Sequence, residues 1–168
     1  MTGHEPGGVD PLARIVFAVL ILSCLAAFFI TQRLKHTPTL LQEFKLAGHF
    51  SPYAAPGHNQ EPISFKLAHA EAVTITIVDV ASSKTVASLL SAYPVPRYKH
   101  FSLHWNGHLG AAHANGHVTT PGGRTILVPE NRGAVAPPGE YRVEVTLLKQ
   151  GHTVPSRNFT VEGPVSGG

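Results

Sequence analysis

The sequence has few of the residues from which catalytic and metal sites are usually built. It contains a single cysteine, Cys24, and only 14% of its residues are charged. Asp79 is the one aspartate after the first quarter of the chain, and no G-x-S-x-G, C-x-x-C or H-E-x-x-H motif occurs. One cysteine cannot form an internal disulfide, and so few carboxylates offer little for general acid–base catalysis. We therefore expect a protein that is not an enzyme and holds no cofactor.

Positive charge is in slight excess but is not concentrated anywhere. The chain has 13 Lys and Arg against 10 Asp and Glu, a net charge of +3, and the basic residues are scattered. A nucleic-acid-binding surface needs a basic cluster, so no nucleic-acid partner is expected. The 16 glycines and 14 prolines favour short strands and many turns, so the chain is expected to be mainly β.

One long uncharged run, Ile15–Ile30, stands near the N-terminus and has Ser23 as its only polar side chain. Extended to the next charge, it would form a helix of about 27 Å at about 1.5 Å per residue, enough to cross the hydrocarbon of a bilayer. We predict an exposed tail over residues 1–13 and a transmembrane helix over residues 14–36, which contacts the lipid bilayer through residues 15–32.

Two other interpretations of this run are less favoured. A cleaved secretory signal needs a shorter apolar core and a small-residue cleavage site, and no A-x-A sequence precedes the QRLK that begins at Gln32. A lipoprotein would use Ile21–Cys24 as its lipid-attachment box, but residues 25–30 continue apolar where an exported linker should begin. A membrane span is preferred, with Cys24 facing lipid or packing against another helix.

Alternation of apolar and polar residues fills the chain after this run. It is clearest in VTITIV, where Val73, Ile75 and Ile77 share one face, and in GEYRVEVTLL from Gly139. Such alternation predicts strands buried on one face, and about seven of them predict an antiparallel β-sandwich over residues 49–162. The expected segments are a linker and first strand over 37–48, a loop over 49–62, strands at 63–67, 73–78, 85–90, 100–105, 139–148 and 158–162, and a disordered tail over 163–168.

Residues 108–138 are the hardest to interpret, because Gly, Ala, His and Pro dominate them. Their one apolar segment is TILV at 125–128, which follows Pro121-Gly122-Gly123. This pattern predicts a hairpin around the two glycines, flanked by mobile loop.

Two motifs carry a resemblance to a known family. Trp105-Asn106-Gly107 ends one predicted strand, and Pro137-Pro138-Gly139-Glu140-Tyr141 begins another. The pair resembles the W-D-G turn and the P-G-x-Y strand start of the immunoglobulin-like domain of the flagellar hook-capping protein FlgD and its relatives. The resemblance implies an immunoglobulin-like β-sandwich over about residues 50–161. Its structural motif would be Trp105, Asn106, Gly107, Pro138, Gly139 and Tyr141.

Flanking charges and the resemblance disagree on orientation. Arg14 precedes the apolar run, whereas Arg33, Lys35 and Lys45 follow it, and this count favours a cytoplasmic C-terminal domain. The whole layout is similar to membrane-anchored proteins of actinobacteria, whose domains of this type lie outside the cytoplasmic membrane. We therefore expect a single-pass protein of the cell membrane with an extracytoplasmic domain.

Histidine is abundant, and His100, His104, His108, His113 and His117 fall close together in the sequence. On a strand, His100 and His104 would share a face, and His108, His113 or His117 could approach from the loop to complete a transition-metal site, with His100, His104 and His108 as the named ligands. A metal-binding sensor or accessory domain is therefore the alternative function.

The preferred function is binding or scaffolding in the cell envelope. Recognition is commonly carried by loops on a rigid sandwich, so the binding surface is expected in the loop 108–136. Its partner would be another envelope protein, docked by strand addition at an open sheet edge, or a cell-wall polymer. The residues expected to bind are His108, His113, His117, Arg124 and Arg132.

Overall fold

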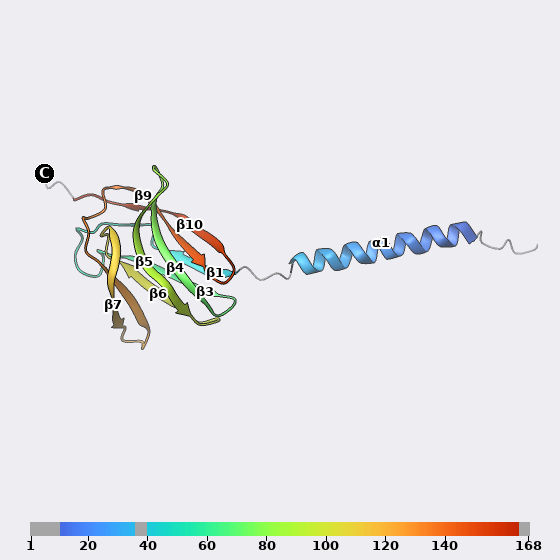
Figure 1. Ribbon diagram of the computed structural model, residues 1–168, viewed down its shortest axis with the longest axis horizontal. Helices are drawn as coiled ribbons and strands as arrows, with labels where there is room; N and C mark the ends of the chain where they lie inside the picture. The colour runs from blue at the N-terminus through green and yellow to red at the C-terminus, as the bar shows by residue number, and fades with distance from the viewer. Residues whose placement is uncertain (1–10, 36–39, 165–168) are drawn as a thin grey trace, which may run out of the picture. The chain divides into compact units, whose positions relative to one another are not determined.

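The computed structural model describes residues 11–35 and 40–164, and the chain divides into two units between Pro38 and Thr39. The first unit contains helix α1, Pro11–Lys35 (Figure 1). This helix begins inside the predicted tail, because proline is well tolerated in the first helical turn, where its missing N–H has no partner to lose. The rest of that tail and residue 36 of the predicted helix lie outside the described residues.

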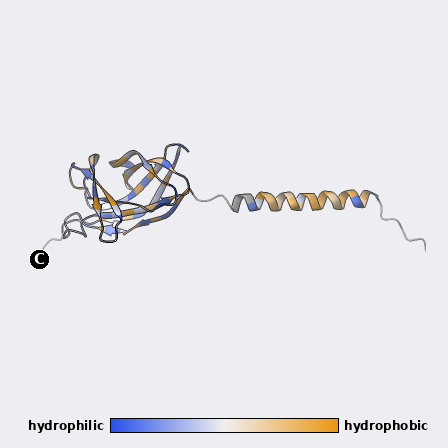
Figure 2. Ribbon diagram, turned by 90° about the horizontal axis from the view of Figure 1, so that it is seen from below, coloured by the Kyte–Doolittle hydropathy of each residue, from blue (hydrophilic) through white to orange (hydrophobic). Residues whose placement is uncertain are grey.

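Helix α1 is long and apolar enough to cross a membrane. Its apolar stretch, Pro11–Gln32, has 22 residues, or about 33 Å at 1.5 Å per residue. Figure 2 shows hydrophobic residues along most of the helix, and its large apolar side chains are exposed. The hydroxyls of Ser23 and Thr31 donate to the carbonyl oxygens of the residues four positions earlier, at 2.8 and 2.6 Å. Both polar groups are therefore paired within the helix, as an apolar solvent requires.

The second unit is one ten-stranded sheet that curls until its two halves face each other (Figure 1). Its order is β1-β3-β6-β8-β7-β5-β4-β9-β10-β2, mostly antiparallel. The mainly β prediction is thus confirmed, with ten strands rather than about seven. The strands are β1 Leu41–Leu46, β2 His49–Phe50, β3 Glu61–Leu67, β4 Glu71–Asp79, β5 Lys84–Val95, β6 Phe101–Trp105, β7 Gly110–Thr119, β8 Thr125–Asn131, β9 Gly139–Leu147 and β10 His152–Val161.

The chain crosses between the two ends of the sheet where β1 gives way to β2. β1 pairs antiparallel with β3, whereas β2 pairs parallel with the end of β10. Glu61 holds this crossing: its side chain is fully buried, and Oε1 accepts hydrogen bonds from Ala47 N at 2.8 Å and Gly48 N at 3.4 Å. Arg157 of β10 donates to Leu46 O at 2.6 Å. These bonds tie the β1–β2 connection to β3 and the end of β1 to β10, so both ends of the sheet are held at this crossing.

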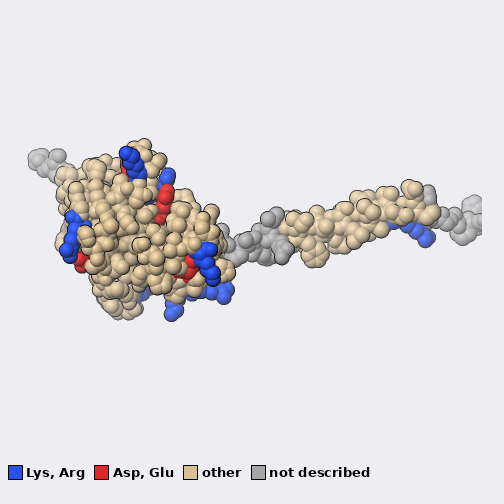
Figure 3. All heavy atoms as spheres, in the orientation of Figure 1, with Lys and Arg blue, Asp and Glu red and all other residues tan. Residues whose placement is uncertain are grey.

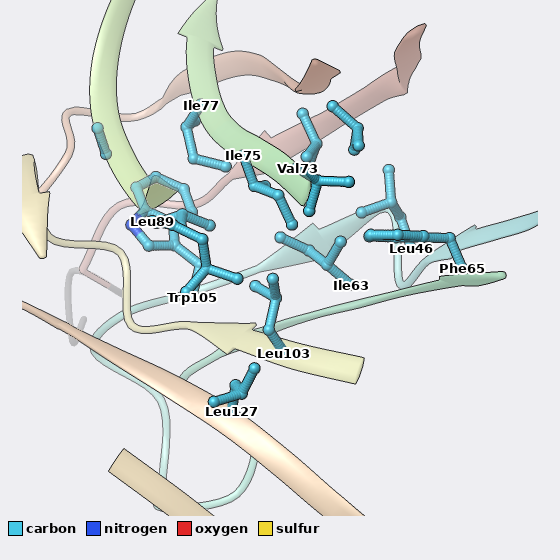
Figure 4. Packing of buried hydrophobic residues seen from close by; sticks show 14 of the residues in the cluster. Leu46, Ile63, Phe65, Val73, Ile75, Ile77, Leu89, Leu103, Trp105 and Leu127 are labelled. Atoms are coloured by element: carbon cyan, nitrogen blue, oxygen red, sulfur yellow. The ribbon is translucent and has the colours of Figure 1, made fainter. Parts of the chain in front are cut away.

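The core lies between the two halves of the sheet. Val73, Ile75 and Ile77 of β4 point toward Ile63 and Leu103 from the opposite half (Figure 4). The inward faces predicted from alternation on β3, β4, β6 and β9 are confirmed, and each large apolar side chain buried this way contributes about 1.5–3 kcal/mol. All core residues belong to the second unit, so this domain has a core of its own.

Trp105 fills one end of the core. Its ring lies 5.7 Å from Phe50, 6.1 Å from Tyr141 and 6.0 Å from Phe159, between ring centroids. Gly107 follows with a φ of 77°, and a Cβ at this position would lie 2.6 Å from Pro52 Cγ. The turn after Trp105 therefore requires glycine both for its backbone conformation and for its space.

Several predicted boundaries were wrong outside the histidine-rich region. The predicted loop 49–62 contains strand β2 and the first residues of β3. β5 continues past residue 90 to Val95, and β10 begins at His152 rather than at residue 158. Both strands contain a proline, Pro94 and Pro155, that does not end the strand because the pairing beside it is irregular. Residue 100 lies before β6, and residue 148 lies after β9. Residues 37–39 and 165–168 of the predicted linker and tail lie outside the described residues.

Candidate functional site

A long hairpin formed by β7 and β8 occupies the region that the sequence left hardest to interpret. The two strands pair from Ala112 with Asn131 to Thr119 with Thr125, and Thr120–Arg124 form the turn. The predicted hairpin around Gly122 and Gly123 is therefore confirmed. The predicted mobile loop over most of 108–136 is wrong, because these residues are strands. Period-two alternation missed β7 because nearly all of its side chains are exposed on both faces.

Buried amide groups fix the base of this hairpin. Asn131 is 2% exposed, and its Nδ2 donates to Ser88 O at 3.2 Å and to Gly110 O at 2.6 Å. Asn106 Nδ2 in turn donates to the backbone oxygen of Asn131 at 3.1 Å. Trp105 Nε1 donates to His108 O at 2.9 Å. The hairpin is thus tied to β5 and to the turn after β6, although its tip extends away from the core.

A groove opens where the hairpin diverges from the rest of the sheet. β6 and β8 pair only at Leu103 and Leu127, and β5 and β7 pair over only two residues each. The resulting cavity has a volume of about 230 Å³. Its walls come from the end of β5, the connection to β6, the start of β6 and the hairpin. The lining residues are Tyr93, Pro94, Pro96, Lys99, His100, Phe101, Ser102, His117, Thr125 and Leu127.

The groove combines an apolar, aromatic floor with a rim that lacks acid. The rings of Tyr93 and Phe101 lie 5.7 Å apart, and none of the described residues that line the cavity carries a carboxylate. Lys99, His100 and His117 are the ionisable side chains at its rim besides Tyr93. The nearest carboxylate identified beside them is Glu43, whose oxygens lie 2.7 Å from Lys66 Nζ and 3.6 Å from His100 Nε2. The hydrogen bond from Lys66 lowers the pKa of Glu43, so this group stays ionised and is already engaged.

The predicted binding residues are dispersed over the hairpin. His117 lines the groove, whereas His113 and Arg124 are exposed elsewhere on the hairpin. Arg132 Nη2 pairs with Glu130 Oε2 at 2.9 Å. His108 lies at the hairpin base, where its Nδ1 is 2.8 Å from Gly133 O.

The three histidines predicted as metal ligands are not brought together. His100 lies beside Glu43, His104 Nδ1 is 3.1 Å from Gln60 Oε1, and His108 contacts Gly133. Burial lowers the pKa of His104, which keeps this ring neutral. Within residues 11–35 and 40–164, no group of three His, Cys, Asp or Glu side chains is arranged to hold a metal ion. His100, His104 and His108 therefore do not form the metal site that the sequence predicted.

The residues of the predicted structural motif surround the base of the hairpin and the adjoining end of the core. Asn106 Oδ1 accepts from His108 N at 3.1 Å, and Gly107 O accepts from Ala136 N at 2.8 Å. Tyr141 Oη donates to Pro137 O at 2.8 Å, directly before Pro138 and the start of β9 at Gly139. Burial raises the pKa of the Tyr141 hydroxyl, so it remains a donor.

Most of the groove was not predicted from the sequence. Alternation places Phe101 on the inward face of a strand, and it gives Tyr93, Thr125 and Leu127 no role. The one local signal is the pair Pro94 and Pro96, which lies at the end of β5 beside aromatic residues. Comparisons with protein-family models, with curated proteins and with solved structures found no match.

Proposed function

We propose that this chain is a membrane-anchored module that binds an extended segment of another protein in the groove between β6 and the β7–β8 hairpin. The groove itself carries the proposal, because it is a built cavity on a rigid sheet and follows an apolar helix long enough to span a membrane. The ionisable side chains at its rim are a lysine, two histidines and a tyrosine, without a carboxylate or a cysteine nucleophile. Binding therefore fits the site better than catalysis.

An extended peptide is the occupant that the surrounding strands favour. Phe101 pairs with β3 on one side, and the described strands give it no ladder partner on the other side, toward the hairpin. Thr125 pairs with β7 and likewise has no ladder partner toward β6. A strand added here could use backbone hydrogen bonds for affinity and the pocket beneath for one side chain. Lys99 at the rim favours a segment with acidic residues.

The proposal includes an immunoglobulin-like arrangement of the domain, of the type found in FlgD relatives. Three observations support it: β1 and β2 divide one edge segment between the two halves of the sheet, β9 and β10 form a hairpin beside β4, and Tyr141 bonds back to Pro137. A tyrosine that bonds to the backbone just upstream of its strand is a recurrent feature of immunoglobulin-like sandwiches.

We also propose that the domain lies outside the cytoplasmic membrane, in the cell envelope. Labelling of a new thiol in the exposed turn after β4 tests this. Ala81→Cys in a Cys24→Ser background should react with a membrane-impermeant maleimide in intact cells. Labelling only after permeabilisation would place the domain in the cytoplasm and remove an envelope partner.

Site-specific photo-crosslinking tests the groove. His117 lines the cavity, and its neighbour Val118 is 54% exposed and points to the opposite face of β7. A photoreactive phenylalanine at position 117 should give crosslinks that map to one short extended segment of a partner, and the same residue at 118 should not. Crosslinks at 117 to carbohydrate would identify a cell-wall polymer instead and would refute strand addition.

Titration of the mapped segment as a synthetic peptide completes the test. Thr125→Trp should fill the groove and weaken binding to residues 40–164 by about tenfold or more, which corresponds to about 1.4 kcal/mol. The matched control, Val118→Trp, adds the same ring on the other face and should leave the affinity unchanged. Equal effects of the two substitutions would show that the groove is not the site.

A further inference from the structure

Four parts of the domain meet at the end where the chain enters it. Leu40 O accepts from Ala68 N at 3.0 Å, and Ala68 O accepts from Arg97 Nε at 3.1 Å. Glu71 pairs with Val95 in the sheet and accepts two hydrogen bonds from Gln150, both at 3.0 Å. The β3–β4 connection, the β5–β6 connection and the β9–β10 turn therefore lie beside the incoming chain.

These connections carry positive charge and contain no Asp or Glu of their own. Residues 68–70, 96–100 and 148–151 contain Arg97, Lys99 and Lys149, two histidines and no Asp or Glu. Glu71 is buried, and both of its oxygens are engaged by Gln150. Figure 3 shows Lys and Arg side chains on the end of the domain where β1 starts, with acidic atoms among them, and Glu43 on β1 already pairs with Lys66. We call residues 68–70, 96–100 and 148–151 the basic end.

Tyr98 belongs to the basic end, and its backbone is strained. Its φ is 56°, a conformation that a bulky side chain rarely adopts, and its side chain is 53% exposed. Tyr98 N donates to Leu67 O at 2.9 Å, which fixes the backbone. The Arg97 guanidinium lies 4.3 Å from the ring centre and donates to Tyr98 Oη at 2.9 Å. Leu148, in the neighbouring turn, is 46% exposed.

We propose that the basic end is a docking surface for anionic phospholipid headgroups. Cations beside an amphipathic ring and an exposed leucine match a layer in which phosphate lies above acyl chains. The chain enters the domain at this end after a helix long enough to span a membrane, so a lipid surface is the partner that the sequence keeps within reach. This inference rests on the proposed membrane anchor and does not require that a partner occupies the groove, although the two sites have Pro96, Lys99 and His100 in common.

Vesicle flotation of residues 40–164 tests the proposal without the helix. The domain should float with vesicles containing anionic phosphatidylglycerol and remain in solution with purely zwitterionic phosphatidylcholine vesicles. The double variant Lys99→Gln, Lys149→Gln should reduce the floated fraction by about fivefold or more, since each Lys or Arg near an anionic membrane surface adds to the attraction between them. The control, Lys84→Gln with Arg124→Gln, removes the same charge from exposed positions at the start of β5 and in the β7–β8 turn and should float like the unmodified domain.

A fluorescent reporter separates docking from general attraction of charge. Trp105 is buried, so the emission of the new indole in a Tyr98→Trp variant can be followed as the difference from the unmodified domain. This emission should shift to shorter wavelength on anionic vesicles. Equal loss of flotation in both double variants, no shift at position 98, or complete competition by millimolar inorganic phosphate would each overturn a lipid-docking surface. Alkaline extraction of the full chain tests the anchor separately: release from membranes would refute the span, whatever the isolated domain does.

Discussion

Replacement of Glu61 tests whether one buried carboxyl group organises the crossing from β1 to β2. Its Oε1 accepts from Ala47 N at 2.8 Å and from Gly48 N at 3.4 Å, while the side chain has no exposed surface. In Glu61→Ala these amides lose their acceptor, which costs about 1–3 kcal/mol for a buried donor, and the cavity adds about 1 kcal/mol. We therefore expect the free energy of unfolding to fall by about 2–4 kcal/mol.

Glu61→Gln separates the hydrogen bonds from the charge. Glutamine keeps an acceptor oxygen and nearly the same volume but cannot ionise. Burial raises the pKa of Glu61 above its ordinary 4.5, so the folded state binds the proton more tightly than the unfolded chain does. The wild-type domain should therefore gain stability relative to Glu61→Gln as the pH falls from neutral through the raised pKa, and the gain should level off below 4.5.

Urea unfolding of residues 40–164, followed by fluorescence, measures both effects. Trp105 is the only tryptophan in the chain and is fully buried, so it reports on the core. The exposed Glu162→Ala serves as control and should change stability by less than about 0.5 kcal/mol. A loss below about 1 kcal/mol in Glu61→Ala, or equal damage from alanine and glutamine at every pH, would refute the role of the carboxyl group.

Three further substitutions test other parts of the domain. Gly107→Ala forces a Cβ to within 2.6 Å of a proline ring at a φ of 77°, so it should lower the free energy of unfolding by about 1–3 kcal/mol, whereas Gly122→Ala in open space should not. Tyr141→Phe removes a 2.8 Å hydrogen bond and should cost about 1 kcal/mol in thermal unfolding; no change would mean that the bond is not stabilising. Asn131→Ala removes two donors at the hairpin base and should speed amide exchange in β7 without affecting β9, and uniform exchange across both strands would contradict a local role.

Strands with one buried face could be predicted because their pattern is local. Val73, Ile75 and Ile77 alternate with polar residues, and this alternation alone fixes which face is buried. The same reasoning fails for β7, where His117 and Val118 both keep exposed surface and no apolar face exists to be recognised. β2 is only two residues long, and its pairing with β10 depends on residues more than 100 positions away, so no local pattern could identify it.

The groove could not be predicted from the sequence because it forms where the pairing between two strands ends. No pattern within either strand shows where that pairing ends. The groove exists because β6 and β8 pair only at Leu103 and Leu127 before their chains diverge. Histidine is frequent in this part of the sequence, but its spacing does not reveal that His100 and His117 line the same cavity. The two side chains share the cavity because β6 and β8 separate. His104 lies between them in the sequence but bonds to Gln60 outside the cavity lining.

The groove and the basic end share Pro96, Lys99 and His100, and this overlap links the two proposals physically. A single ammonium group cannot pair fully with a headgroup phosphate and with a partner carboxylate at the same time, because either ion pair takes up its few donors. Substitution of Lys99 should therefore weaken both interactions. Thr125→Trp should affect only the groove, and Lys149→Gln only the lipid surface, since neither of these side chains belongs to the other site. Partner binding should therefore be tighter in solution than on anionic vesicles, and Lys99→Gln should reduce this difference whereas Lys84→Gln should not.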